Sequence, residues 1–226
     1  ALDDNYFLQH YNIPKEKLFV IETRNVGKHS DSSDWGQVIY CDNKDLKFYQ
    51  EMIKFIYDKD LSKKENYSYF CDRFMDINSF MDYIIAQIFS SNNFGFEKSM
   101  IWKSKTKEED QFLDGKFRFA LNHFDTGMNN WSWSIHDTIG ILLADNKEDV
   151  SFATLLFSRL IKNNEFKKEF VNRSMTYFST IYAPETVNKT IEEMSNILKP
   201  GMYEHNKRWS VQKQEYDSTE FYDINL

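Results

Sequence analysis

Apolar residues recur at helical spacing along much of the chain. Within residues 45–58 they lie three and four positions apart, which places them on one face of a helix: Leu46, Tyr49, Met52, Ile53 and Ile56. The same spacing predicts a helix over residues 76–91, whose apolar side carries Phe80, Ile84, Ile85 and Ile88. Because that stripe is the strongest in the chain, we expect residues 78–91 to be buried at the centre of the core.

Polar residues mark the beginnings of these helices. Asp76 and Asn78 are both suitable N-caps for the helix over residues 76–91, and the sequence leaves the choice open. Ser62 and Glu65 have the spacing of a capping box, which predicts a short helix after them.

Four short segments have the length and composition of strands. Residues 17–23 and 36–41 are apolar runs on either side of a polar loop. Residues 99–104 and 116–121 flank a charged loop and read as the two arms of an irregular hairpin. We therefore expect the last two segments to pair antiparallel.

The C-terminal part of the chain is helical in pattern. Helices are predicted over residues 150–162, 165–182 and 185–198, with Pro184 in the first turn of the last one. The third helix is expected to bury a stripe made of Val187, Ile191, Met194 and Leu198. Pro200 is expected to open a separate final turn or short helix.

These elements predict an α+β fold that is mainly α, with one small antiparallel sheet in the middle of the chain. A length of 226 residues corresponds to one large domain or a domain and a half. Hydrophobic residues make up 41% of the chain and aromatic residues 17%, which is enough for a sizeable core.

Charge and cysteine content exclude several classes of protein. The net charge of −7 argues against a nucleic-acid partner, because phosphate binding needs a basic surface. No stretch approaches the roughly 20 apolar residues of a membrane span. Cys41 and Cys71 are predicted to be two unpaired thiols, with a single bridge as the alternative in a secreted setting.

Asp125 is the first candidate for chemistry, because it follows the strand over residues 116–121 and precedes Gly127. Aspartate before a turn glycine often only satisfies backbone N–H groups, so a turn-forming role is the plain alternative. A strand end followed by glycine can also present a carboxylate oxygen to a metal. His123 and His136 flank this aspartate, but they lack the fixed spacing of a zinc site, which is therefore not predicted.

The order of parts around Asp125 is that of a protein kinase, in which a helix, a catalytic loop and a hairpin precede the metal-binding aspartate. Three segments in this order, DINSFMDYIIAQIFSSNN, MIWKS and DGKFRFALNHFDTG, resemble the spore coat protein H (CotH) family of atypical protein kinases. Two further segments, FSRLIKNNEFKKEFVNR and PGMYEHNKRW, resemble its helical C-terminal half. The resemblance implies the helical lobe of an atypical kinase-like fold. It also implies one CotH-like domain over residues 1–226, with the nucleotide-binding part largely missing from this chain.

The resemblance assigns a role to Asp125, and the chain departs from the family at the residues before it. The metal-binding aspartate of the family, which ends a Trp-Asp-x-Asp motif, matches Asp125. The tryptophan and aspartate that begin the motif are replaced by Asn122 and His123. The cofactor-binding end of the hairpin therefore keeps one of the family's two carboxylates.

The catalytic loop departs further from the family, whose loop reads Asn-x-Asp-Trp-Pro-x-Asn-Asn. Asn93 or Phe94 falls at the place of the catalytic base, and an amide can orient a hydroxyl but cannot accept its proton. Glu97 or Lys98 replaces the metal-binding asparagine, and a lysine there would repel Mg²⁺. A carboxylate in this cleft needs a donor, so we expect Asp125 within about 4 Å of Lys98 or Asn93.

Two functions follow from the resemblance. The first is an atypical protein kinase, predicted to be catalytically degenerate. If active, it would use ATP and Mg²⁺ or Mn²⁺ to phosphorylate Ser or Thr of a protein partner. The second is a non-catalytic structural or adhesion module that keeps the fold for protein contacts. The family implies the spore coat, or a secreted or cell-surface location.

Overall fold

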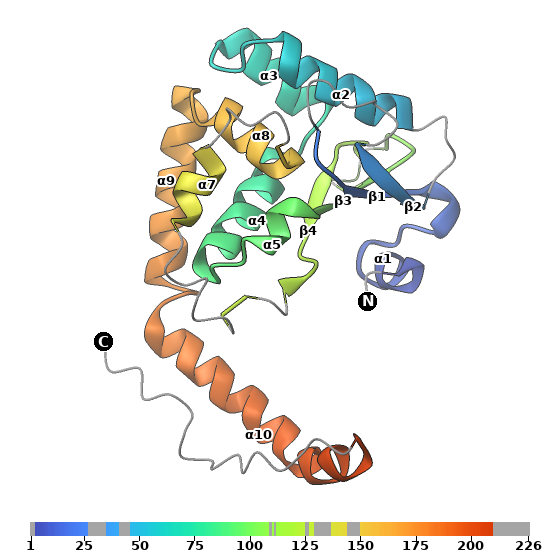
Figure 1. The fold of residues 1–226 in the computed structure, drawn as a ribbon. Helices are drawn as coiled ribbons and strands as arrows, with labels where there is room; N and C mark the ends of the chain where they lie inside the picture. Colours follow the sequence, from blue (N-terminus) through green and yellow to red (C-terminus); the bar gives the residue numbers. More distant parts are fainter. Residues whose placement is uncertain are drawn as a thin grey trace. The chain divides into compact units, whose positions relative to one another are not determined.

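The fold is seen in a computed structural model that describes residues 3–26, 35–40, 46–108, 110, 112–124, 127–128, 137–143 and 150–209. The chain divides into two compact units, Ala1–Met175 and Thr176–Leu226. The first unit combines helices with one sheet, and the described part of the second is helical (Figure 1). The predicted class, α+β and mainly α, is confirmed. No described helix has both the length and the apolar character needed to cross a membrane.

The sheet has four antiparallel strands in the order β2-β1-β3-β4. The strands are β1 (Leu18–Thr23), β2 (Gly36–Tyr40), β3 (Met100–Ser104) and β4 (Arg118–Ala120). The predicted hairpin is confirmed, because β3 pairs with β4 and Trp102 lies opposite Arg118. The two segments predicted at 17–23 and 36–41 also pair with each other.

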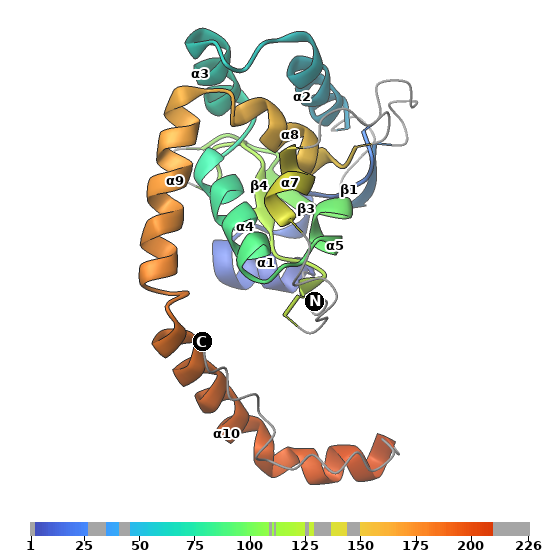
Figure 2. The ribbon, with the colours of Figure 1, turned by 60° about the vertical axis from the view of Figure 1, so that its left-hand side comes forward.

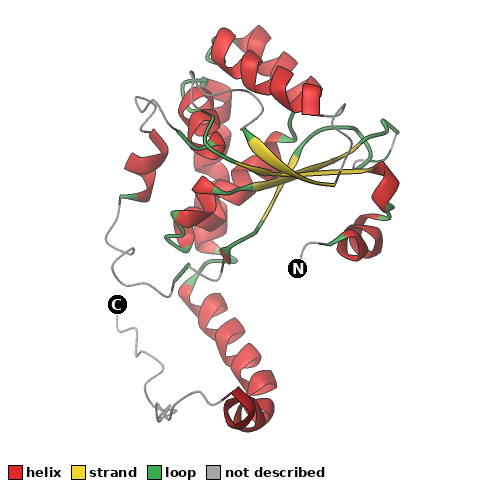
Figure 3. Ribbon diagram, turned by 45° about the vertical axis from the view of Figure 1, so that its right-hand side comes forward, coloured by secondary structure: helices red, strands yellow, loops and turns green. Residues whose placement is uncertain are grey.

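Side chains alternate between the two faces of this sheet, because successive residues of a strand point to opposite sides. One face packs against the short helix α1 (Asp4–Tyr11). Its buried cluster combines residues of α1, of the segment after it and of the strands: Phe7, Ile13, Leu18, Val20, Met100 and Trp102. Figure 3 shows α1 below the sheet and α2 (Leu46–Asp58) above it.

The opposite face of the sheet packs against helices. Phe119 of β4 lies 4.9 Å from Phe80 and 4.7 Å from Tyr83, both in α4 (Ile77–Phe89), measured between ring centroids. Its ring is also stacked on Phe152, the first residue of α8 (Phe152–Leu160). Helix α4 is central, as predicted, and buries Phe80, Met81, Tyr83, Ile84, Ile85, Ala86 and Gln87. Ile88 is half-buried, at the end of the predicted stripe.

Besides α3 (Lys64–Arg73) and a 3₁₀ helix at Lys15–Lys17, the described part of the first unit has three further helices. They are α5 (Phe94–Glu97), α7 (Thr138–Leu143) and the greater part of α9 (Asn164–Ser179). Figures 1 and 2 both place α5, α7 and α8 beside α4. Phe166 and Phe170 of α9 are buried and contact Phe157 of α8.

The structure shows which of the predicted N-caps begin their helices. Asp76 caps α4, because its carboxylate accepts hydrogen bonds from the backbone N–H groups of Asn78 and Ser79. The predicted capping box is wrong: α3 (Lys64–Arg73) begins after Lys63 and has no side-chain cap. The hydroxyl of Ser62 instead donates to Asp60 at 2.7 Å, so the side chain that would cap the helix is already used by the turn before it.

The last helix departs most from the sequence prediction. Helix α10 (Pro184–Trp209) continues through Pro200, so the separate final turn predicted after this proline is wrong. Proline lacks a backbone N–H and bends a helix, and Figure 2 shows that α10 is bent along its length. The prediction of a buried stripe is also wrong. Ile191, Met194 and Leu198 are 41%, 58% and 59% exposed, because no described element of the second unit covers them.

Candidate functional site

The candidate site is built where the chain leaves α4 and where it leaves β4. The side-chain amide of Asn92, just after α4, donates to the backbone carbonyl of His123 at 3.0 Å. The backbone N–H of Met128 donates to the carbonyl of Ser90 at 2.8 Å. The segments on both sides of Asp125 are therefore fixed to the turn that follows α4. Asp125 itself lies outside the described residues, and so does its expected contact with Lys98 or Asn93.

Gly127 allows the segment after Asp125 to pack closely against the turn that follows α4. A Cβ at this position would lie 3.0 Å from the Cβ of Ser90 and 3.3 Å from the Cβ of Asn92. Both distances are shorter than ordinary van der Waals contact, and both neighbours are buried. The glycine after Asp125 is thus explained by close packing against the turn.

Gly127→Val is expected to lower the free energy of unfolding by about 1–3 kcal/mol, because the added methyl groups must displace Ser90 or Asn92. Gly127→Ala adds a single methyl group, so it should lower the free energy of unfolding less than Gly127→Val does. Urea denaturation followed by circular dichroism measures both. Equal stability of the valine variant and the unchanged protein would show that the two segments are not packed in solution.

Backbone strain gathers at the same junction. Ser91, His123 and Met128 have positive φ angles of 51°, 53° and 59°. Residues other than glycine rarely adopt this left-handed conformation, which costs of order 1–3 kcal/mol at each position. Asn12, the other described non-glycine residue of this kind, simply ends α1. A cluster of strained residues in two contacting segments is typical of a functional site or of its remnant.

Asn93 occupies the predicted base position directly before α5. The oxygen and nitrogen of its side-chain amide are buried and have no hydrogen-bond partner among the described residues. An unpaired buried amide costs free energy that folding must offset elsewhere. The geometry thus leaves an amide at this position that can orient a hydroxyl group but cannot take up its proton.

Helix α5 holds this part of the loop against α4. The hydroxyl of Tyr83 in α4 donates to the backbone carbonyl of Gly95 at 2.5 Å. Burial raises the pKa of Tyr83 well above its ordinary value, so the hydroxyl remains a donor at neutral pH. A Cβ at Gly95 would collide with the side-chain amide of Gln87, so a larger residue at this position would have to displace that amide from between α5 and α4.

Glu97 and Lys98 end this short helix. Both side chains are exposed, and Glu97 is the last residue of α5. They take the place of the metal-binding asparagine implied by the resemblance, so an acid and a base replace a neutral oxygen ligand.

His123 and Asn122 stand at the start of the strained segment after β4. Asn122 is half-buried, and the Nε2 atom of His123 lies 3.6 Å from a carboxylate oxygen of Glu22 in β1. The two side chains form an ion pair whenever the imidazole is protonated. Glu22 is not among the predicted site residues, although a glutamate inside an apolar strand is a visible signal in the sequence.

The described residues do not fit a magnesium–nucleotide site. Mg²⁺ takes an octahedral set of oxygen ligands, usually one or two carboxylates with phosphate and water oxygens. The described positions supply an exposed glutamate, a lysine ammonium, an amide, and a histidine that faces Glu22. Within the described ranges, no three side chains of His, Cys, Asp or Glu gather closely enough to share a metal ion.

Comparison with known proteins gives one match. A family model described as CotH kinase protein matches residues 1–223, which is nearly the whole chain. No curated protein and no solved structure is significantly similar to the chain.

Proposed function

The chain belongs to the CotH kinase family, and we propose that it is a catalytically degenerate member whose kinase-like fold binds a protein partner. In this proposal the chain has the architecture of a kinase but does not transfer phosphate. It also takes residues 1–226 as one CotH-like domain, with the spore coat or the cell surface as its location.

The observation that carries the proposal is the buried amide of Asn93. A kinase needs a carboxylate at the base position to accept the proton of the substrate hydroxyl. The side-chain oxygen of Asn93 is a weak base, and it lies buried without a hydrogen-bond partner among the described residues. A hydroxyl placed beside it would be oriented without being activated.

The replaced metal positions support the same conclusion. Phosphoryl transfer depends on neutralising the phosphate charge with metal ions held on oxygen ligands. In this chain a lysine or an exposed glutamate stands at one such position, and His123, which replaces the first aspartate of the family's motif, faces Glu22. With Asp125 as the single matching carboxylate, the site retains too few ligands for metal-assisted transfer.

One observation favours an active kinase as the second candidate. The hydrogen bonds from Asn92 and Met128 keep both flanks of Asp125 on the turn after α4. An active enzyme would need this proximity, with ATP and Mg²⁺ or Mn²⁺ as its cofactors and a Ser or Thr of a protein as its acceptor.

Incubation with radiolabelled ATP and Mg²⁺ or Mn²⁺ distinguishes the two candidates. We expect no label above background in the chain or in an added protein acceptor, because no group at the base position takes up the proton. Isothermal titration with the magnesium–ATP complex should likewise give no measurable heat of binding.

The Asp125→Ala variant is the matched control in both experiments, and it should behave as the unchanged chain does. Strong autophosphorylation that disappears in Asp125→Ala would overturn the proposal. It would also show that the active kinase is the correct candidate.

A further inference from the structure

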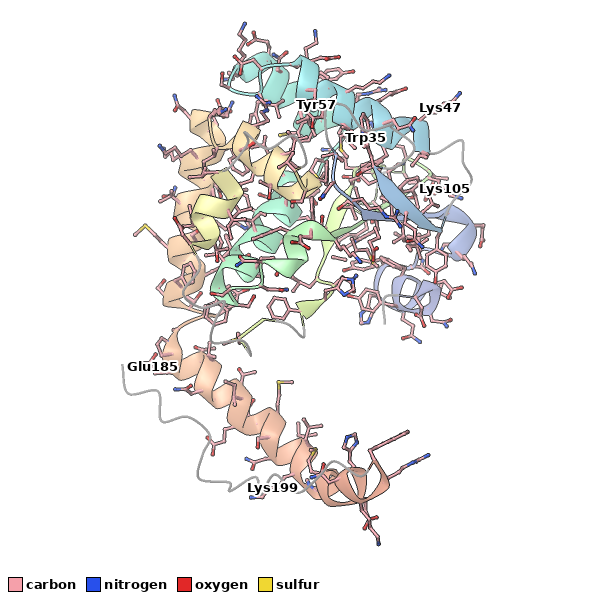
Figure 4. All side chains as sticks on the ribbon, in the orientation of Figure 1. Trp35, Lys47, Tyr57, Lys105, Glu185 and Lys199 are labelled. Atoms are coloured by element: carbon pink, nitrogen blue, oxygen red, sulfur yellow. The ribbon has the colours of Figure 1, made fainter. Side chains whose placement is uncertain are left out.

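A pocket of about 260 Å³ lies between the end of α2 and the end of α8. It is lined by the last two residues of α2, by the turn that follows, and by two cationic side chains from the end of α8 and the segment after it. Figure 4 labels Tyr57, one of the lining residues, on α2 at the end opposite to Lys47. No lining residue belongs to the candidate site, so this pocket needs an explanation of its own.

Hydrogen bonds hold the walls of this pocket in place. The side-chain amide of Asn163 donates to the backbone carbonyls of Leu61 and Ser62 at 3.1 and 3.3 Å, which joins the turn after α2 to the segment after α8. The hydroxyl of Tyr57 donates to the backbone carbonyl of Val26. Because these walls are fixed without a ligand, little conformational freedom remains to be lost when one binds.

Arg159, in the last turn of α8, is the unusual residue of the pocket. It is half-buried, and its Nε atom is buried without a hydrogen-bond partner among the described residues. Asp58 and Asp60 line the same pocket, but within the described chain neither forms an ion pair with Arg159. Asp60 instead accepts hydrogen bonds from the backbone N–H and the hydroxyl of Ser62, at 3.0 and 2.7 Å. A buried donor without an acceptor is costly, so an acceptor from outside the chain would stabilise it.

The charge of the pocket has the opposite sign to the charge of the chain. The lining carries three cationic side chains, Lys59, Arg159 and Lys162, against the two carboxylates Asp58 and Asp60, which leaves a formal charge of +1. The whole chain has a formal charge of −7. The pocket is therefore suited to one negative charge on a chain that otherwise repels anions.

We propose that this pocket binds a carboxylate group through the guanidinium of Arg159, with Lys59 beside it. The planar fork of an arginine matches the two oxygens of a carboxylate. A single negative charge balances the lining, whereas a doubly charged phosphate would leave an excess of negative charge next to Asp58 and Asp60. The volume lies just below the roughly 300–1,000 Å³ of pockets for drug-sized ligands, so it has room for a carboxylate and the few atoms attached to it.

A small free carboxylic acid and the side chain of a glutamate offer this same chemistry, and a titration of the ¹⁵N-labelled full chain followed by NMR distinguishes them. The probes are sodium acetate and N-acetylglutamate amide, with N-acetylglutamine amide as the neutral control and sodium chloride as the control for ionic strength. The Nε–H signal of Arg159 is identified by its absence in Arg159→Gln. We expect this signal to shift saturably with both carboxylates and with neither control, because the N–H group gains an acceptor. A response to acetate alone would assign the pocket to a free acid, and a response to the glutamate derivative alone would assign it to a side chain.

Variants measure the contribution of each cation, with the backbone amide signals of residues 58–62 as the readout. Arg159→Gln should raise the dissociation constant of the bound carboxylate by at least about tenfold. Arg159→Lys should also weaken binding, because a lysine keeps the charge but lacks the planar fork. Lys59→Glu gives the lining a formal charge of −1 and should weaken binding as well; Lys59 is exposed, so this variant leaves the fold intact. Arg24→Gln, at an exposed arginine that bonds to Gln37, is the matched control and should leave the constant unchanged.

Three results would overturn the proposal. One is the absence of a saturable shift up to about 100 mM of either carboxylate. Another is a dissociation constant that is the same in Arg159→Gln, Lys59→Glu and the unchanged chain. The third is tighter binding of inorganic phosphate than of either carboxylate, which would assign the pocket to a different anion.

Discussion

Phe119→Ala is expected to lower the free energy of unfolding by about 3–5 kcal/mol, the usual cost of removing a buried phenylalanine. The ring is only 7% exposed and lies between the sheet and the helices. It contacts Phe80 and Tyr83 of α4 and is stacked on Phe152 of α8, so its removal leaves a cavity that three elements share.

Chemical denaturation monitored by circular dichroism measures this loss. Leu121→Ala is the matched control, because Leu121 lies two residues further along the chain and is 50% exposed. Its effect should stay near 0.5 kcal/mol, as for other surface substitutions. If the two variants lost similar stability, the ring of Phe119 would not occupy the centre of the core.

The central helix and the hairpin could be predicted because their signals are local. The stripe of α4 continues over several turns, and each of its predicted apolar residues is buried or half-buried. The strands of the hairpin each pack between two layers, so both appear as short apolar runs in the sequence. The capping box failed because Ser62 has a competing partner, Asp60, which the spacing rule does not consider.

The apolar residues of α10 show what the sequence pattern cannot predict. The spacing of Ile191, Met194 and Leu198 correctly predicts an amphipathic helix. It does not say which surface covers the apolar side, because a helix buries its stripe equally well in its own domain or against another chain. In the structure these residues are exposed, so the predicted helix is present and its predicted burial is not.

The order of the site's segments along the chain could be predicted from the sequence, but the contacts of their side chains could not. The sequence placed Asn93, Glu97, Lys98, Asn122 and His123 in two segments, and the structure brings those segments together through Asn92 and Ser90. A glutamate inside an apolar strand is visible in the sequence, but its pairing with His123 is not, because Glu22 lies about 100 residues earlier in the chain and reaches the site through the pairing of β1 with β3.

Arg118 joins the sheet to the start of α4. Arg118 is 5% exposed. Its guanidinium donates two hydrogen bonds of 2.9 Å to the carboxylate of Asp114, and its Nε lies 3.2 Å from a carboxylate oxygen of Asp76, which also caps α4. It lies over the rings of Trp102 and Phe112 at 5.7 and 5.6 Å. The charge of this buried cation is therefore compensated by two carboxylates and by the faces of two aromatic rings.

Arg118→Ala is expected to lower the free energy of unfolding by about 3–5 kcal/mol, because it removes the buried cation of the ion pair, which also packs on two aromatic rings, and leaves two half-buried carboxylates uncompensated. Arg24→Ala is the matched control, because the guanidinium of Arg24 forms an exposed hydrogen bond with Gln37. Its loss should stay near 0.5 kcal/mol. Urea denaturation at pH 7 measures both variants, and equal losses would contradict a structural role for Arg118.

The same ion pair should make the stability of the chain depend on acid. Burial alone would raise the pKa of Asp114, but the hydrogen bonds from Arg118 and from the backbone N–H of Lys116, together with their positive charges, lower it below its ordinary value. A carboxyl whose pKa is lower in the folded state contributes stability above its unfolded pKa of about 3.9. That contribution is lost as the pH falls through the folded value. Asp114→Asn should therefore be less stable than the unchanged chain at pH 7, and urea denaturation at decreasing pH should show the two converging below about pH 4. A stability difference that stays constant down to pH 2 would show that Asp114 does not titrate with the pair.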